Sequence, residues 1–265
     1  MTTVHSGGGA DPAKSLRLLW QGRQKPSRGP KPGLELDDIV TAAVALADRE
    51  GIGALSMRKV AAEMGVGTMT LYRYVPGKSE LLALMLDHVQ APDEAEEKAL
   101  RELGPGQWRA ALERIGESTF RLYLRHPWLV QVNQSRPLLG PNALRGFDTT
   151  LAVLAPLNLS DQDRISVVSM IDSLVTGMAR TQILQQQAVQ ESGISDEEFW
   201  AAQETVLNTA AEPGDFPHVF ALDDNSFDLS HEETMRFALA RLLDGLEAFL
   251  AARRQRAGDS GAAED

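Results

Sequence analysis

Residues 56–78 concentrate side chains that could bind the surface of a nucleic acid. Arg58, Arg73 and Lys78 carry cations that suit phosphate, and an arginine can also donate two hydrogen bonds to the O6 and N7 atoms of one guanine. The threonine and tyrosine hydroxyls between them suit phosphate oxygens, and threonine methyls suit the thymine methyl. This chemistry is recognition rather than bond cleavage. The candidate DNA contacts are Ser56, Met57, Arg58, Gly67, Thr68, Met69, Thr70, Tyr72, Arg73, Tyr74 and Lys78.

The same segment is predicted to fold as two short helices joined by a glycine turn. Ser56 can cap the first helix, at about 57–64, because its hydroxyl can accept a free backbone N–H. Gly65 follows the last periodic apolar residue, where a left-handed backbone is often required. The second helix is expected at about 68–74, with Leu71 facing inward. Two helices in this order form a helix-turn-helix, which is sized for the DNA major groove.

The chain resembles the TetR family of bacterial repressors from Leu36 to Leu86. The most specific part is TLYRYVPGKSELL, because it fixes the second helix, the turn and the next helix together. The C-terminal two thirds is similar, more loosely, to the ligand-binding domain of the tetracycline-repressor-like branch. That weaker similarity rests on HPWL at 126–129, RPLLGPN at 136–142 and IDSLVTGMAR at 171–180.

This resemblance implies an all-α fold, with an N-terminal three-helix helix-turn-helix domain and a C-terminal helical domain for ligand binding and dimerisation. It implies a ligand-responsive repressor that binds double-stranded DNA at a palindromic operator as a homodimer. A small, largely apolar effector, such as a drug or antibiotic-like metabolite, would release it by moving the helix at 78–89. Family members vary at the positions of Met69 and Arg73, so these residues are expected to set operator choice.

The expected organisation has four parts. They are a flexible basic extension at 1–33, the helix-turn-helix domain at 34–90, the ligand-binding and dimerisation domain at 106–253, and a disordered tail at 254–265. An acidic, polar connector at 91–106 separates the two domains. Helices are predicted at about 36–50, 57–64, 68–74, 78–89, 106–125, 127–135, 141–155, 160–189, 195–210 and 230–253.

The extension leaves two interpretations open. Arg23, Lys25 and Arg28 lie among prolines and glycines, so this stretch is expected to be extended and mobile. It is either a disordered leader or an arm that contacts phosphates or enters the adjacent minor groove.

Charge is divided unevenly along the chain, whose net charge is -11. Residues 1–80 hold 11 Lys and Arg against 8 Asp and Glu, whereas residues 81–265 hold 15 against 29. The basic excess therefore lies on the segment that would need phosphate contacts. The acidic second part favours a neutral or cationic ligand over an anionic one.

Aromatic and methionine side chains of the second domain are candidates for an effector pocket, since such a set suits an apolar, flat ligand. For each of them the alternative is plain helix-bundle core. The candidates are His88, Trp108, Phe120, Tyr123, Trp128, Met170, Leu174, Met178 and Gln182.

Two long amphipathic helices, at 160–189 and 230–253, could bury an apolar stripe within one subunit or pack against a second copy. We expect a homodimer, because one helix-turn-helix reads only a few base pairs and two related by a two-fold axis read a palindrome.

Other classes of protein are disfavoured. The chain has no cysteine, which excludes disulfides, and no apolar run approaches the roughly 20 residues of a membrane span. With no signal-peptide pattern, we expect a cytoplasmic protein without a membrane partner. The five histidines show no metal-binding spacing, so no metal or other cofactor is expected. Three enzyme-like strings, at 72–79, 65–67 and 258–261, lack the residues or the scaffold that their chemistry needs, so no catalytic residue is assigned. The alternative is a helical module that binds a small molecule or a protein without sequence-specific DNA binding.

Overall fold

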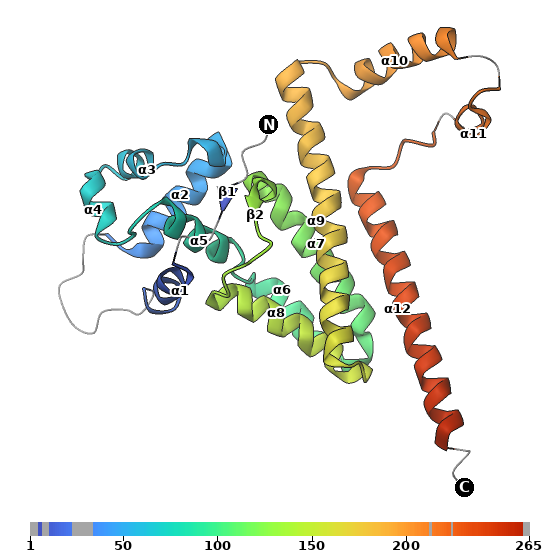
Figure 1. The fold of residues 1–265 in the computed structure, drawn as a ribbon, viewed down its shortest axis with the longest axis horizontal. Coiled ribbons are helices and arrows are strands. Elements are labelled where there is room, and N and C mark those ends of the chain that lie inside the picture. The colour runs from blue at the N-terminus through green and yellow to red at the C-terminus, as the bar shows by residue number, and fades with distance from the viewer. Residues whose placement is uncertain (1–4, 7–10, 23–33, 212–213, 224, 262–265) are drawn as a thin grey trace.

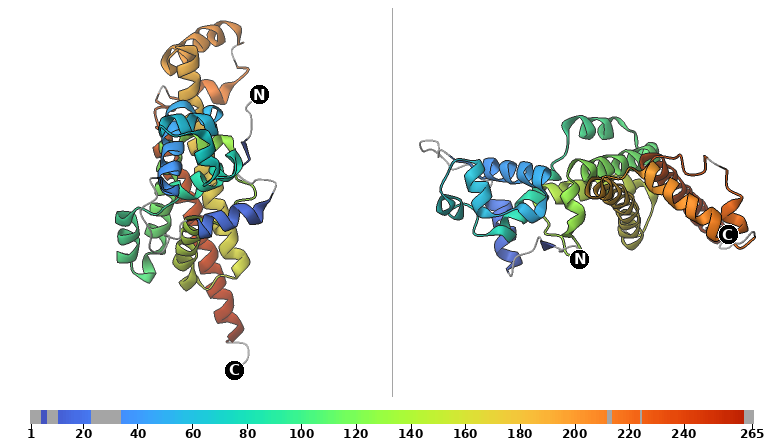
Figure 2. Two further views of the ribbon diagram at one scale, coloured as in Figure 1. Left: turned by 90° about the vertical axis from the view of Figure 1, so that its left-hand side faces the viewer. Right: turned by 90° about the horizontal axis from the view of Figure 1, so that it is seen from above.

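The structure is a computed structural model that describes residues 5–6, 11–22, 34–211, 214–223 and 225–261. It is helical almost throughout, which confirms the all-α prediction (Figure 1). A small N-terminal domain lies beside a longer helical bundle (Figures 1 and 2). Two further helices, α10 (Asp196–Ala210) and α11 (Pro217–Phe220), project from one end of that bundle. Across the described residues, no helix combines the length and the apolarity needed to cross a bilayer.

In the N-terminal domain, the helices at 36–50 and 78–89 lie where the sequence predicts them. The predicted first helix and the predicted linking helix begin and end as expected, and the Asp38 carboxylate accepts a hydrogen bond from the backbone N–H of Glu35 at 3.2 Å. The elements are α2 (Leu36–Glu50), η1 (Ile52–Ala54), α3 (Met57–Glu63), α4 (Thr68–Tyr72) and α5 (Lys78–Val89).

The second domain places α7 at its centre, packed against α8, α9 and α12. A Cβ atom on Gly116 of α7 would lie 2.6 Å from Leu239 of α12, so these two helices approach closely. The elements are α6 (Glu94–Glu102), η2 (Pro105–Gln107), α7 (Trp108–Arg125), η3 (Pro127–Gln131), β2 (Val132–Asn133), α8 (Pro141–Leu154), η4 (Ala155–Leu157), α9 (Asp161–Ser192), α10 (Asp196–Ala210), α11 (Pro217–Phe220) and α12 (His231–Gly261).

Four expectations are corrected by the structure. Part of the extension expected to be flexible is helix α1 (Pro12–Gln21), which packs on α5 and buries Leu19 completely. The helix predicted at 127–135 is only the short 3-10 helix η3, followed by β2, which pairs in parallel with β1 (His5–Ser6).

The other two corrections concern connecting and terminal segments. Helix α6 occupies most of the expected connector, because the Asp93 carboxylate accepts the backbone N–H groups of Ala95 and Glu96 and so caps it. Helix α12 continues to Gly261, through residues that were expected to belong to a disordered tail.

A buried carboxylate joins the two domains. Asp87, near the end of α5, is 2% exposed and accepts the backbone N–H groups of Asn142 and Ala143 at 3.0 and 3.1 Å. These N–H groups belong to the first turn of α8, whose positive dipole end favours a negative charge. The Asn142 side chain donates in return to the Asp87 carbonyl at 3.0 Å. A Cβ on Gly140 would lie 2.2 Å from the Asp87 carboxylate, so only glycine fits there.

Two further hydrogen-bonded contacts hold the domains together. Asp48 of α2 accepts the indole N–H of Trp128 at 2.7 Å and lies 2.8 Å from Nδ1 of His126. Trp20 of α1 donates to the Leu139 carbonyl at 3.0 Å, in the loop before α8. One continuous apolar core runs through both domains beneath these contacts.

We expect Asp87→Ala to lower the free energy of unfolding by about 1–3 kcal/mol, because two buried N–H groups lose their acceptor. Urea denaturation followed by circular dichroism would measure this. Asp161→Ala is the matched control: this carboxylate lies in the first turn of its own helix, α9, but it is 97% exposed and should change stability by less than about 0.5 kcal/mol. Equal effects of the two substitutions would contradict a structural role for Asp87.

Candidate nucleic-acid interface

The turn between α3 and α4 has the predicted geometry. The Ser56 hydroxyl accepts the backbone N–H of Lys59 at 3.2 Å and so caps α3. Gly65 has a φ of +66°, in the left-handed region where a side chain would be strained. The N–H of Val66 reaches back to the Ala61 carbonyl at 3.0 Å, which closes the end of α3. These bonds fix the angle at which α4 leaves the turn.

Two buried anchors set which face of α4 is exposed. Leu71 and Val75 are both fully buried, and the N–H of Val75 bonds to the Leu71 carbonyl at 2.9 Å. With these residues inward, Met69 is 76% exposed and Tyr72 is 44% exposed, although both are large and largely apolar. Arg73 is also exposed. The other polar side chains of this segment are half-buried, namely Thr68, Thr70 and Tyr74.

The basic side chains of this domain fall into two groups. Lys59 bonds to Glu50 at 2.8 Å, and Arg49 bonds to both Glu50 and Glu63, so these cations hold α2 and α3 together. The Lys59 ammonium and the Arg49 guanidinium hold the pKa of Glu50 below its ordinary value. These pairs occupy the carboxylates of Glu50 and Glu63.

The second group is available to a partner. Arg58, Arg73 and Lys78 form no ion pair within the part of the chain that the structure describes. Arg58 is exposed on the first turn of α3, Arg73 ends α4, and Lys78 begins α5. Unpaired cations around an exposed helix can bind phosphates on either side of a groove.

Some predicted DNA contacts are placed differently. The side chain of Met57 is only 6% exposed and belongs to the core, so it is not a surface for DNA. The hydroxyl of Ser56 is already used in the cap of α3, and Gly67 presents only its backbone, at the N-cap of α4. Arg23, Lys25 and Arg28 lie outside the described residues.

The residues predicted to line an effector pocket are dispersed. Phe120 and Tyr123 of α7 are buried in the continuous core, and burial raises the pKa of the Tyr123 hydroxyl. Leu174 and Met178 of α9 pack against the same core, as plain helix-bundle residues would. Gln182 is half-buried farther along α9.

Three of the other candidates lie elsewhere. Trp128 belongs to the contact with Asp48 between the domains, and Met170 is 53% exposed on α9. His88 is half-buried on α5, next to Asp87.

Trp108, also from the predicted set, lines a cavity that has a volume of about 440 Å³ and lies between α6, α7 and α8. Leu100 and Leu103 form one side of it, and Ala152 and Val153 of α8 form another. Leu100 and Leu103 were not predicted as lining residues, because segment 91–106 was interpreted as a connector. The Asp93 cap followed by leucines was the signal that could have found them.

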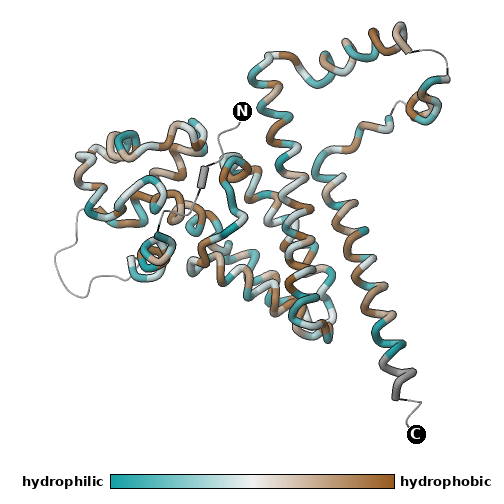
Figure 3. The backbone as a smooth tube through the Cα atoms, in the orientation of Figure 1, coloured by the Kyte–Doolittle hydropathy of each residue, from teal (hydrophilic) through white to brown (hydrophobic). Residues whose placement is uncertain are grey.

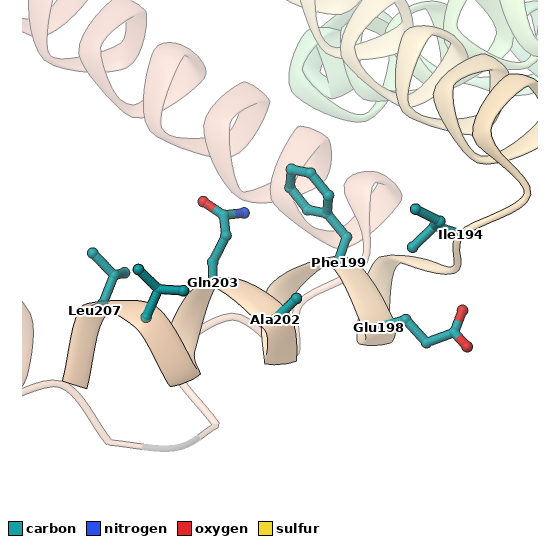
Figure 4. A pocket seen from close by; sticks show the side chains of 7 residues that line it. Ile194, Glu198, Phe199, Ala202, Gln203 and Leu207 are labelled. Carbon is teal, nitrogen blue, oxygen red and sulfur yellow. The ribbon is translucent and has the colours of Figure 1, made fainter. Parts of the chain in front are cut away.

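A second hollow, of about 400 Å³, lies along α10 and is open to solvent (Figure 4). Phe199 and Gln203 project from the same side of α10 there, with Ile194 at one end and Leu207 at the other. Its lining is apolar apart from Glu198 and Gln203. Among the described residues, no group of three or more His, Cys, Asp or Glu side chains could hold a metal ion.

Comparison with known proteins agrees with this geometry. Residues 39–85 match the family of bacterial regulatory proteins described as the tetR family, and residues 101–250 match the tetracyclin repressor-like C-terminal domain. The HTH-type transcriptional repressor DrrR1 of Streptomyces coeruleorubidus is 50% identical over 254 residues, covering 95% of this chain and 92% of that protein. An HTH-type transcriptional regulator of Saccharopolyspora erythraea is 36% identical over 159 residues, covering 60% and 65%.

A solved structure has a similar fold. The crystal structure of ActR, a TetR family protein of Streptomyces coelicolor, in complex with actinorhodin superposes with a TM-score of 0.67 and 27% identity, covering 82% of this chain and 97% of that one.

We expect Arg58→Ala and Lys78→Ala each to weaken binding to duplex DNA and to flatten its salt dependence. Each lost phosphate contact should reduce the slope of log K against log salt by about 0.9 for every copy bound. Fluorescence anisotropy over a series of KCl concentrations would measure the slope. Lys98→Ala, which removes a 75% exposed cation from α6, should leave it unchanged. An unchanged slope for Arg58→Ala and Lys78→Ala would remove these residues from the interface.

Proposed function

Because the chain belongs to the TetR family of bacterial transcriptional regulators, we propose that it is a repressor that binds a palindromic operator as a homodimer and is released by a small, largely apolar effector. As a member of this family, it is a regulator and not an enzyme. The observation that carries the proposal is the face of α4. There the exposed Met69 and Tyr72 stand beside cations that no carboxylate of the described chain neutralises.

The exposed side chains of α4 support sequence-specific recognition. Burying large apolar groups such as Met69 and Tyr72 against a partner would be favourable, and the thymine methyl and the sugar edges offer such a surface. Arg73 can reach a base edge or a phosphate from the end of α4. Arg58 and Lys78, at the starts of the flanking helices, are suited to fix the register by binding the backbone.

Exposed apolar residues support the homodimer. Eleven of the 23 large hydrophobic side chains that are exposed among the described residues lie between Ile194 and Leu229, in and around α10 and α11. Phe237 of α12 is 61% exposed and Ile165 of α9 is 45% exposed. The hydropathy colouring shows apolar segments along α10 and α12 (Figure 3). A monomer rarely exposes so much apolar surface, and a two-fold partner would cover it.

The hydrogen bonds of Asp87 supply a route for release. An effector that enters between α7 and α8 would change the position of α8, and the carboxylate of Asp87 would pull α5 with it. Since α5 follows the recognition helix directly, the separation of two recognition helices in a dimer would change. The effector then shifts the population from dimers that fit DNA to dimers that do not.

The proposal includes an effector that is a small molecule, as actinorhodin is in the ActR complex. The related ActR has been solved in complex with actinorhodin, and the related DrrR1 is a transcriptional repressor. The 440 Å³ cavity beside Trp108 is within the usual size range of sites for small molecules.

The deciding experiment is selection of duplexes from a random DNA library by the purified full chain. Enrichment of a palindrome would support the proposal and supply the operator. A matched variant, Arg73→Ala, should lose enrichment at the base pairs that this residue reads. A second variant with alanine at positions 23, 25 and 28 tests the basic extension while leaving α1 intact. A folded protein that enriches no sequence would overturn operator binding and favour a helical module that binds ligands or proteins.

We expect Phe237→Glu to raise the dissociation constant of the dimer by at least about 100-fold, because both subunits would bury a charge at the interface. Sedimentation velocity over a dilution series would measure this constant. Phe147→Glu changes a phenylalanine of α8 that is 36% exposed and should leave dimerisation unaffected. If Phe237→Glu stays dimeric at the same concentrations as the unmodified chain, this face of α12 is not the interface.

A further inference from the structure

We propose that the cavity between α6, α7 and α8 selects a flat aromatic cation, with Asp148 as its counter-ion and Trp108 as its stacking partner. The inference rests on the proposed function in one respect, because it takes this cavity as the effector site. It goes further by assigning a charge to the effector. Its evidence is the chemistry of the lining, which combines an apolar interior with an unequal number of acidic and basic groups.

The interior of the cavity suits an aromatic ring system. Leu100, Leu103 and Val153 contribute branched aliphatic side chains, and Trp108 contributes an indole that is half-buried at the start of α7. An indole face attracts a cation as well as a neutral ring, since its π system is negative above and below the plane. With a volume of about 440 Å³, the cavity would hold one small molecule.

The charges at the rim are not balanced. Three charged side chains line the cavity, namely Glu97, Arg101 and Asp148. The guanidinium of Arg101 is 3.4 Å from the carboxylate of Glu97, so these two groups largely compensate each other. Asp148 forms no ion pair within the described chain, even with Arg145 one turn earlier on α8. The cavity therefore presents one uncompensated negative charge.

This excess charge discriminates between ligands of the same shape. An anionic ring would be repelled by Asp148, and a neutral ring would gain nothing from it. A cationic ring would form an ion pair at the rim and a cation–π contact with Trp108. Glu96 of α6 does not alter this balance, because Arg114 and Arg121 of α7 bind it at 3.0 and 2.9 Å.

Three acridines of similar shape test the inference with the purified full chain in the absence of DNA. They are 9-aminoacridine, which is a cation at pH 7, acridone, which is neutral, and acridine-9-carboxylate, which is an anion. Isothermal titration calorimetry should give the order of affinity cation, neutral, anion. Asp148→Asn should weaken binding of 9-aminoacridine by about fivefold, the value of one partly exposed ion pair, and leave acridone unchanged.

Two further variants locate the site and control for charge. Ala152→Trp places an indole within the cavity and should abolish binding of both the cation and the neutral ring. Glu102→Gln removes a 68% exposed carboxylate of α6 that does not line the cavity, and it should change neither affinity.

Equal affinity for the cation and the neutral ring would overturn the inference, as would an Asp148→Asn variant that binds both as the unmodified chain does. A folded chain that binds none of the three rings would also overturn it. None of these results depends on DNA. A failure here is therefore distinct from a failure of the repressor proposal, which would appear as a lack of enrichment in the duplex library.

Discussion

The rest of the structure depends on one buried carboxylate, that of Asp87. It lies at the end of the helix that follows the recognition helix, and it binds the first turn of a helix in the other domain. A buried charge is tolerated only where hydrogen bonds replace its water, and here backbone N–H groups at a helix N-terminus do so. A Cβ on Gly140 would lie 2.2 Å from this carboxylate, so the two helices are closely packed at the contact.

Around this junction, the protein separates structural charges from available ones. In the N-terminal domain, Arg49 and Lys59 are paired with acids of α2 and α3, while Arg58, Arg73 and Lys78 have no acidic partner in the described chain. Only the second group can exchange water and counterions for phosphates without giving up an ion pair of the fold. At the cavity between α6, α7 and α8, Glu97 is likewise paired with Arg101. Asp148 has no ion-pair partner in the described chain, so it is the carboxylate that is available to a ligand.

Exposed apolar side chains gather in and around α10 and α11 among the described residues. Phenylalanine and tryptophan side chains are exposed along α10, α11 and α12, well away from the recognition helix α4 (Figure 1). Covering this surface by a second copy would set two recognition helices at a fixed spacing. The proposed dimer face, the proposed effector cavity and the proposed DNA surface are thus three separate parts of the chain, connected through α7, α8 and α5.

The sequence by itself determined the family, the all-α class and most helix limits, because capping residues, glycine turns and apolar periodicity are local signals. Ser56, Gly65 and Leu71 took the roles that their spacing predicts, since each role depends only on neighbours within one or two turns. The tertiary structure decided which charges are paired, that Trp128 joins the domains, and that the cavity combines Trp108 with residues of α6 and α8 that were not predicted. Those features join residues that are tens of positions apart, such as Asp48 with Trp128 and Asp87 with Asn142. Local periodicity carries no information about which distant side chains meet.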